Sequence, residues 1–408
     1  ACRFCGVKQG AFLMQEKPFF IILTKRMMNV IRKMLALLLA FGMLGCAVCH
    51  SEEWDTFARQ KFGARKITGG AVVIALDGEV LYSYTHGFRD ARQTQRTTLD
   101  TCFRAASVTK LVSAIGLMRL MEEKGLSLDT PVTEIVGFPV RNPSYPDRPV
   151  TVRQGLSHTS SILSTNYYFP SWEKMGVGTI YFAEPYGPGD KYVYSNLNGG
   201  LIGAMIEALS GQSVNSYMQQ HVFRPLSVNA AYQAALLPDT ADIADRMDKD
   251  GTLFQTVKRA MKDIENYEDT CDPRWHTDRT VGSLYISVNG MIRLISMLEN
   301  GGELDGVRIL QPETVQLMMQ DQDEIPGSTV HCKGRYGLCL DRVKNMPGGT
   351  WYGHQGRLRG LSANMYFQPD TGLCIAVIAD GYTAYTQDEV VTIARVFMEK
   401  AQELLPQE

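Results

Sequence analysis

Residues 107–125 read SVTKLVSAIGLMRLMEEKG, a polar tetrad followed by an apolar run. The apolar side chains recur at helical spacing and Gly125 follows the charged end of the run, which predicts a buried helix that stops at this glycine. Positions three apart share a helix face, so the amine of Lys110 can reach the hydroxyl of Ser107. The unpaired N–H groups at the start of a helix can also stabilise an oxyanion. The stretch therefore predicts a serine nucleophile, and acyl transfer is the leading function.

An S-x-x-K pattern is weak by itself, because a chain of this length contains roughly one by chance. A second one, Ser171 to Lys174, follows Pro170 and runs into Gly176 and Gly178. It has no long apolar run behind it and is predicted to be a loop.

Composition limits the classes of function. The chain has 408 residues, 45% of them hydrophobic, and a net charge of -2. This is enough apolar material for a substantial core in one large domain or two. The charge gives no electrostatic reason to expect nucleic-acid binding. A small-molecule or peptide substrate is the expected partner, and the sequence sets no oligomeric state.

The N-terminal region has the plan of a signal peptide. Basic residues precede the apolar run 34–48, MLALLLAFGMLGCAV, and a polar segment follows it. We expect residues 1–51 to be a leader and the mature protein to start near residues 46–52. Acylation of Cys46 as a lipoprotein, or an uncleaved membrane anchor, are the alternatives. The expected location is secreted, periplasmic or membrane-anchored outside the cytoplasm.

The cysteines give no dense disulfide pattern. Of the nine, Cys332 and Cys339 are the two that could pair across a turn, with buried free thiols as the alternative. The CxxC pairs of residues 2–5 and 46–49 lack matching downstream ligands, so no zinc is assigned. We expect no metal and no organic cofactor.

Strand patterns occur at both ends of the chain. Residues 69–87 contain two β-rich runs joined by Asp77-Gly78, a hairpin signal, and strands return from Tyr336 onward, followed by a helix over 388–405. The middle is predicted to be helical. The expected fold is α+β: an antiparallel sheet flanked by terminal helices, with an inserted helical subdomain. The predicted domain covers 52–402, with its sheet part over about 52–105 and 330–402, its helical part over about 106–329, and the catalytic cleft at their seam.

Three segments follow one another in an informative order: FRAASVTK at 103–110, VYSNLNGG at 193–200 and YGHQGRLRG at 352–360. Together they resemble the serine β-lactamase and penicillin-binding-protein superfamily, in particular the class C β-lactamase-related group with its D-alanyl-D-alanine carboxypeptidases, D-aminopeptidases and esterases. The similarity covers about residues 52–402. It implies the transpeptidase-like fold and an acyl-enzyme mechanism without a cofactor.

The resemblance assigns roles to the first two motifs. Tyr194 and Lys110 are the candidate bases for Ser107, because a lysine made partly neutral by burial or a phenol next to cations can accept a proton. Asn196 is expected to hold Lys110 and the substrate amide by hydrogen bonds. Its alternative role is that of a turn residue capping the next helix.

The third motif departs from the K-T-G of β-lactamases. His354 is expected on an edge strand facing the cleft, where it could donate a hydrogen bond to Tyr194 or to the substrate. The exchange of lysine for histidine removes a fixed positive charge and disfavours efficient β-lactamase activity. Gly356 is expected to let the strand approach the substrate, and the backbone N–H groups of Ser107 and Arg357 to form the oxyanion hole.

Two further features keep two interpretations each. Arg357 and Arg359 could bind a substrate carboxylate or be solvated loop charges. Aromatic residues between the first two motifs could line a pocket or pack against the helical part; these are Tyr167, Tyr168, Phe169, Trp172, Tyr181 and Tyr186. His158 resembles a turn segment of the family and not a catalytic base.

The predicted function is a secreted or membrane-tethered serine hydrolase acting through an acyl-enzyme. Its expected substrates are small esters or amides and peptides with a D-residue, with cell-wall peptides among them if the host has peptidoglycan. The alternatives are a non-hydrolysing penicillin- or peptide-binding sensor on the same fold and a true class C-like β-lactamase.

Overall fold

The computed structural model describes residues 46–163, 182–183, 185–262, 269, 271–272, 279–324, 336–382 and 392–405. The chain divides into two compact units, 1–55 and 56–408. Helix α2, Cys46–Ala64, crosses this division. The second unit is described by itself below. Within the described residues, no helix is both long and apolar enough to cross a membrane.

The two ends of the second unit build one antiparallel six-stranded sheet, in the order β10-β11-β12-β13-β1-β2. β1 and β2 form the predicted hairpin, whose turn residues Asp77 and Gly78 both have positive φ, 49° and 85°. β1 then pairs with β13 along its whole length, from Gly69 opposite Asp380 to Leu76 opposite Leu373. The strands are β1 Gly69–Leu76, β2 Glu79–Gly87, β10 Asp341–Met346, β11 Gly349–Leu358, β12 Leu361–Gln368 and β13 Leu373–Asp380.

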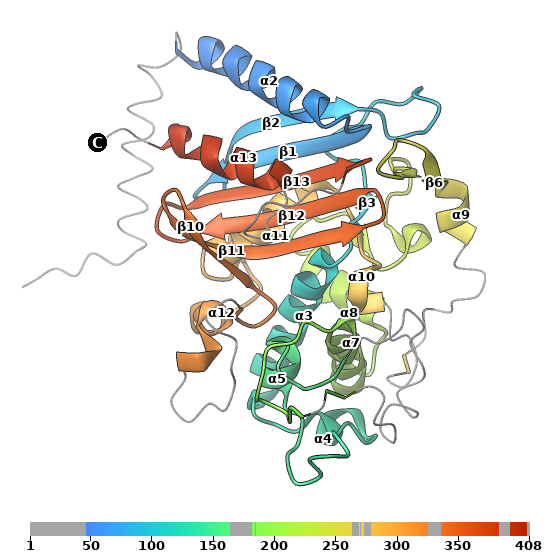
Figure 1. The fold of residues 1–408 in the computed structure, drawn as a ribbon, viewed down its shortest axis with the longest axis vertical. Helices are drawn as coiled ribbons and strands as arrows, with labels where there is room; N and C mark the ends of the chain where they lie inside the picture. The colour runs from blue at the N-terminus through green and yellow to red at the C-terminus, as the bar shows by residue number, and fades with distance from the viewer. Residues whose placement is uncertain are drawn as a thin grey trace, which may run out of the picture. The chain divides into compact units, whose positions relative to one another are not determined.

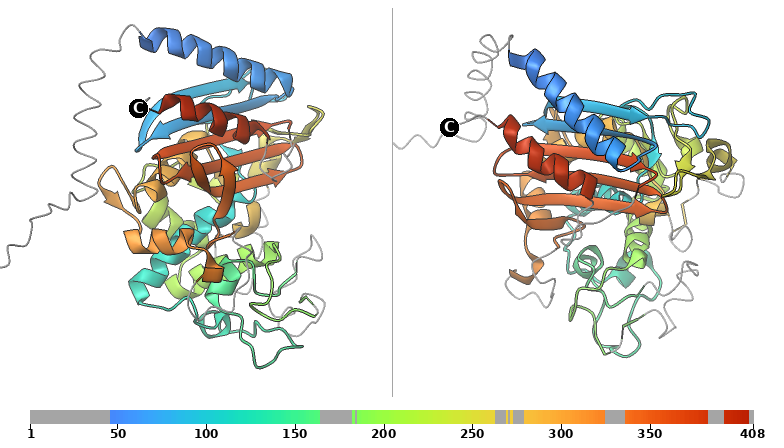
Figure 2. Two further views of the ribbon diagram at one scale, coloured as in Figure 1. Left: turned by 60° about the vertical axis from the view of Figure 1, so that its left-hand side comes forward. Right: turned by 45° about the horizontal axis from the view of Figure 1, so that its top comes forward.

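Helices cover both faces of this sheet (Figures 1 and 2). β12 and β13 are buried at every position, as expected for strands covered on both sides. α11, Val288–Glu299, packs on one face against β13, β12 and β1. α13, Thr392–Ala401, packs on the other, where the rings of Phe57 and Phe62 of α2 lie 5.6 and 5.8 Å from that of Phe397. The predicted α+β fold with terminal helices is confirmed.

The middle of the chain is mostly helical around α3, Val108–Lys124, which is buried along most of its length and ends at Gly125 with φ 61° as predicted. α3 packs against α7 and α10. The helices here are α4 Val132–Val136, α5 Val152–Leu156, α7 Asn196–Ser210, α8 Val214–Met218, α9 Val257–Lys262, α10 Arg279–Gly282 and α12 Pro312–Met319; short helical turns cover Gln219–Phe223, Ala234–Leu236, Gln322–Glu324 and Gln402–Leu404.

Short strands also lie in this middle part, which was expected to be helix and loop. A three-stranded sheet joins β3, β7 and β4, and its pairing of Phe103 with Ile286 sets the start of α3 beside α10. These strands are β3 Phe103–Arg104, β4 Ala230–Ala231, β5 Arg246–Met247, β6 Leu253–Gln255, β7 Tyr285–Ile286, β8 Glu303–Leu304 and β9 Val307–Arg308.

One strand boundary differs from the prediction. The pattern from Tyr336 predicts a strand, but β10 begins only at Asp341. The N–H groups of Leu338 and Cys339 donate to carbonyls of the helical part, those of Met318 and Leu156, at 2.9 Å each. The backbone of segment 336–340 is therefore bonded to the helical part before β10 begins, and Cys339 has φ 54°.

Candidate active site

Ser107 lies immediately before α3, where β11 crosses the start of the helix. A Cβ atom added to Gly356 of β11 would lie 2.2 Å from the carbonyl oxygen of Ala105 and 3.0 Å from the backbone nitrogen of Ser107. Only glycine allows this approach. The approach of the strand to a substrate stays a prediction, and the structure shows that β11 comes close to the backbone next to the serine at this position.

The side chain of Lys110 is fully buried and its amine has three oxygen partners. Nζ lies 3.1 Å from Oγ of Ser107, 3.0 Å from Oδ1 of Asn196 and 2.7 Å from the carbonyl oxygen of Val281. The structure thus brings together the serine, lysine and asparagine of the first two motifs. The sequence did not predict the contact with the carbonyl of Val281, because every residue has a backbone carbonyl and the residue type does not show which one will bind the lysine.

These partners fit a neutral lysine as well as a charged one. The oxygens of Asn196 and Val281 can only accept, and a neutral amine has two N–H groups for them and one lone pair left. That lone pair faces the hydroxyl of Ser107, which can donate its proton to it. Burial lowers the pKa of Lys110 to about 7, so the neutral form is well populated near neutral pH.

The lysine chain reaches its partners across the start of α7. A Cβ atom on Gly199 would lie 3.0 to 3.3 Å from carbon atoms of the Lys110 side chain, so the absence of a side chain at Gly199 leaves room for the lysine. Thr280 of α10 donates to the carbonyl of Gly199 at 2.6 Å. The three helices that meet at Lys110 are therefore linked to one another.

Tyr194 lies beside the amine and is partly open to solvent, with 39% of its surface exposed. Nζ of Lys110 is 5.2 Å from the centroid of its ring. The imidazole of His158 also packs against the Tyr194 ring, with the two ring centroids 4.3 Å apart and the ring planes tilted by 34°. Tyr194 is thus the solvent-facing member of the group, and His158 supports it.

His158 was predicted from the sequence to be part of a turn, and it is also a buried residue of the site. It lies in a turn, with φ 56°, but its Nδ1 accepts the backbone N–H of Ser195 at 3.2 Å. Burial holds the pKa of His158 well below its ordinary value, so the ring is neutral. Through this bond and the ring contact it fixes the segment that presents Tyr194 and Asn196. The isolated histidine in the sequence gave no signal for that role.

His354 does not have the surroundings that were expected. β11 pairs with β10 as far as Gly353, opposite Asp341, and among the described residues no strand pairs with that edge from His354 onward. The His354 side chain is 2% exposed, and Nε2 lies 2.8 Å from the hydroxyl of Tyr336 while Nδ1 lies 2.6 Å from the carbonyl of Gln355. Tyr336, and not Tyr194, is its hydrogen-bond partner.

The proton on His354 follows from these contacts. A carbonyl can only accept, so Nδ1 carries the proton that Gln355 receives. Burial lowers the pKa of His354, so the ring is neutral and Nε2 accepts the proton of the Tyr336 hydroxyl. Burial also raises the pKa of Tyr336 well above its ordinary value, so that proton stays in place. In the structure both ring nitrogens thus have partners other than Tyr194, namely Tyr336 and the carbonyl of Gln355.

The two arginines after Gly356 differ. Arg357 is exposed at the end of β11. Arg359 forms an ion pair with Asp248, and its guanidinium carbon lies 4.9 Å from the ring centroid of Phe254. Arg359 therefore already has an anionic partner.

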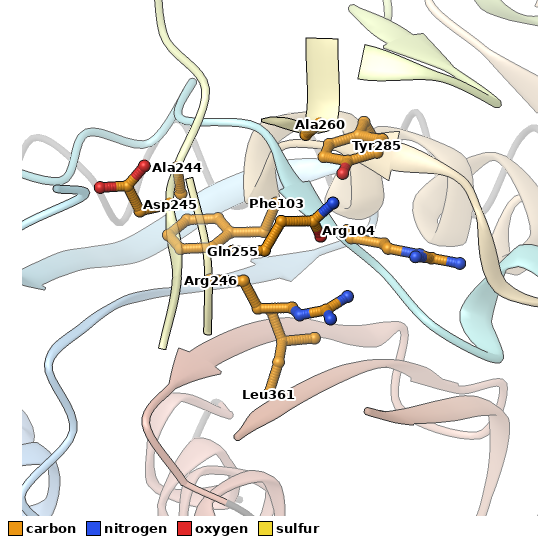
Figure 3. Close-up of a pocket in the computed structure, with 9 residues that line it drawn as sticks. All are labelled: Phe103, Arg104, Ala244, Asp245, Arg246, Gln255, Ala260, Tyr285 and Leu361. Atoms are coloured by element: carbon orange, nitrogen blue, oxygen red, sulfur yellow. The ribbon is translucent and has the colours of Figure 1, made fainter. Parts of the chain in front are cut away.

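Arg104 holds the segment that supplies the Val281 carbonyl. Its Nε donates to the carbonyl of Gly282 at 2.8 Å and its guanidinium to Oγ of Ser283 at 3.2 Å. Arg104 also borders a cavity of about 10 Å³ with Leu361, shown in Figure 3. This volume holds about one water molecule and no substrate.

Ser171 and Lys174, Cys332 and most of the aromatic segment lie outside the described residues. Of that segment Tyr186 is described and is exposed. Cys339 is a buried free thiol, and burial raises its pKa to about 12. In the described part of the chain, no three side chains of His, Cys, Asp or Glu gather as metal ligands.

The family follows from comparison with known sequences. The profile of the Beta-lactamase family matches residues 54–395, most of the chain. This chain belongs to the β-lactamase family. Members similar to it include penicillin-binding protein 4 of Amycolatopsis lactamdurans, 24% identical over 78% of this chain and 82% of that protein. Esterase EstB of Burkholderia gladioli is 28% identical over 43% of this chain and 49% of its own length.

Solved structures of the family share the fold. The octameric penicillin-binding protein homologue from Pyrococcus abyssi is 25% identical, with a TM-score of 0.64 over 81% of this chain and 74% of that one. A class C β-lactamase mutant superposes with a TM-score of 0.65 at 17% identity, over 86% and 96% of the two chains. The protein is accordingly a hydrolase of the β-lactamase family.

Proposed function

We propose that this protein is a serine hydrolase in which neutral Lys110 removes the proton of Ser107 and the serine attacks the carbonyl of a small, uncharged ester. The observation that supports this most strongly is the buried amine of Lys110, 3.1 Å from the serine hydroxyl and with its other partners limited to acceptors. We also propose that residues 1–51 direct the enzyme out of the cytoplasm, free or tethered at Cys46.

The chemistry runs through an acyl-enzyme. Oγ of Ser107 bonds to the carbonyl carbon while its proton passes to Nζ of Lys110, and the carbonyl oxygen becomes an oxyanion. The backbone N–H groups of Ser107 and Arg357 are the proposed oxyanion hole, supported by the close approach of β11 to Ser107 at Gly356. The lysine returns its proton to the alcohol that leaves. A water that gives its proton to Lys110 then attacks the acyl carbon, the bond from that carbon to Oγ of Ser107 breaks, and the lysine returns the proton to Oγ as the acid leaves.

The preference for uncharged substrates rests on the third motif. His354 is neutral and both its ring nitrogens are bonded, so this position gives a substrate carboxylate no cation. Arg359 is already paired with Asp248. An esterase relative in the family agrees with this choice, and efficient β-lactam hydrolysis is disfavoured.

Hydrolysis of amides or peptides with a D-residue is the second candidate. It is supported by Arg357, an exposed cation that follows Gly356 directly in β11 and could pair with a terminal carboxylate. Replacing Arg357 with Gln is then expected to raise KM for a peptide with a free carboxylate and to leave KM for a neutral ester unchanged.

Intact-mass spectrometry tests the proposal. The wild type, Ser107→Ala and Ser171→Ala are each incubated with a neutral ester, a D-amino-acid peptide and a penicillin, and adduct and product are followed together. Ser171→Ala is the matched control, because it removes the serine of the other S-x-x-K. We expect ester turnover in the wild type and the control, and none in Ser107→Ala. An adduct on Ser107 without product would indicate a sensor, and equal turnover in all three would exclude the mechanism.

A further inference from the structure

A groove of about 580 Å³ lies between the end of α2, the end of β2 and the loop that follows it. Its volume is in the range of small-ligand sites. β2 is the edge strand farthest from β11 in the sheet order, so the groove is separate from the serine. His86 in this groove packs against Phe62 of α2, with ring centroids 5.3 Å apart. It therefore lies on the face of the sheet covered by α2 and α13.

The charges that line this groove are all of one sign. Arg59, Lys66 and Arg96 are exposed at its wall, and the lining contains no aspartate or glutamate. Within the described part of the chain, none of the three forms an ion pair. The chain as a whole has a net charge of -2, so general basicity does not explain the cluster. Three cations around one concave surface repel each other unless an anion lies between them.

Arg96 is held in place to receive such an anion. Its guanidinium carbon lies 4.2 Å from the ring centroid of Phe88, a cation–π contact that uses none of the N–H groups an anion would need. Phe88 and Arg96 also form a backbone bridge, and the carboxylate of Asp90 accepts the backbone N–H groups of Thr94 and Gln95 inside the loop. The loop therefore positions the arginine without a substrate or partner.

His86 can add a fourth positive charge. Burial and the nearby Arg96 lower the pKa of His86, and a hydrogen bond to the backbone of Ile67 opposes them. The ring is thus neutral when the groove is empty at neutral pH. An anion placed among these groups would favour its protonated form.

We propose that this groove, the cationic groove of Arg59, Lys66, Arg96 and His86, binds a phosphate group, either free or on a lipid headgroup. Three fixed cations and one that can be gained match the charge of a phosphate better than that of a single carboxylate. The forked guanidinium of Arg96 suits its oxygens. Binding at this groove is independent of the chemistry at Ser107.

The test is a titration of the full chain with inorganic phosphate, pyrophosphate and citrate, followed through the imidazole NMR signals of His86. We expect saturable binding of the phosphates that raises the pKa of His86 and weakens with salt. Arg96→Gln and Lys66→Gln are each expected to weaken binding by about tenfold. Arg141→Gln is the matched control, because it removes an exposed arginine outside the groove, and it is expected to change nothing.

Vesicles of phosphatidylglycerol, compared with phosphatidylcholine, separate the two sources of the phosphate group. Binding of the anionic vesicles that is lost in Arg96→Gln would assign a headgroup, and binding of free phosphate alone would assign a soluble ligand. No saturable binding by the wild type, tighter binding of citrate than of both phosphates, or equal weakening by Arg141→Gln would overturn the proposal. Ester turnover is expected to be unchanged in Arg96→Gln and Lys66→Gln, and thermal unfolding checks that both variants fold.

Discussion

Lys110 of α3 and His354 of β11 are both buried bases near Ser107, and burial lowers the pKa of each. They differ in whether a nitrogen lone pair is left to accept a proton. Two partners of Lys110 are pure acceptors and the third is the serine hydroxyl, so the neutral amine keeps its lone pair for the serine. His354 accepts a hydrogen bond from Tyr336 and donates one to Gln355, so neither ring nitrogen is left to accept a proton. A lowered pKa makes a base available only where a free lone pair faces the proton to be moved.

The largest expected effect comes from Lys110→Gln. Glutamine can still donate to Asn196 and Val281 but has no basic lone pair, so kcat for ester hydrolysis is expected to fall by about 10³. The same change relieves the burial of an amine, so the free energy of unfolding at pH 7 is expected to rise or stay level. Steady-state kinetics and thermal unfolding measure the two effects. Activity within about tenfold of wild type would show that another group is the base.

Gly356→Ala is expected to reduce kcat by about 10², because its Cβ would lie 2.2 Å from the carbonyl of Ala105 and would push β11 away from Ser107. Gly155→Ala is the control, since a Cβ at Gly155 meets no atom within 4 Å. Kinetics of both variants with the same ester test this point. An unchanged kcat in Gly356→Ala would remove the argument that β11 forms half of the oxyanion hole.

His354→Gln is expected to reduce kcat by less than about tenfold, because the amide oxygen can still accept from Tyr336 and His354 moves no proton in this mechanism. Together with Lys110→Gln, this variant compares the loss of each of the two buried bases when glutamine replaces it. If the two variants lost activity equally, the distinction between the free and the committed base would be wrong.

Tyr336→Phe is expected to lower the free energy of unfolding by about 1 to 3 kcal/mol, because Nε2 of His354 then lacks its partner in a buried place. The hydrogen bond that favours the neutral ring is lost, so the pKa of His354 is expected to rise. Tyr232→Phe removes another buried phenol, bonded to Ser113 at 2.8 Å, and controls for the loss of stability alone. Imidazole NMR titration follows His354, and no rise in its pKa would contradict the assignment of the proton.

The sequence predicted the parts of this site that depend on local spacing. The step from Ser107 to Lys110 is one helical turn, and Asp77-Gly78 specifies a hairpin, so both follow from chemistry along the chain. Tyr336 and His354 are brought together by the bend at 336–340, whose N–H groups bond to Leu156 and Met318. That contact, like the Val281 carbonyl and the support from His158, depends on packing between distant segments, and a periodic pattern cannot reveal it.

The pH dependence of Ser107 acylation tests the central claim most directly. Single-turnover rates with a neutral ester are measured by intact-mass spectrometry from pH 5 to 10 for the wild type and His354→Gln. Because the base must be neutral, the rate is expected to rise with pH through one step centred near 7, the pKa of Lys110, in both proteins. Lys110→Arg, which stays charged, is expected to show no such step. A step near 10, no step at all, or a step that vanishes in His354→Gln would contradict Lys110 as the base.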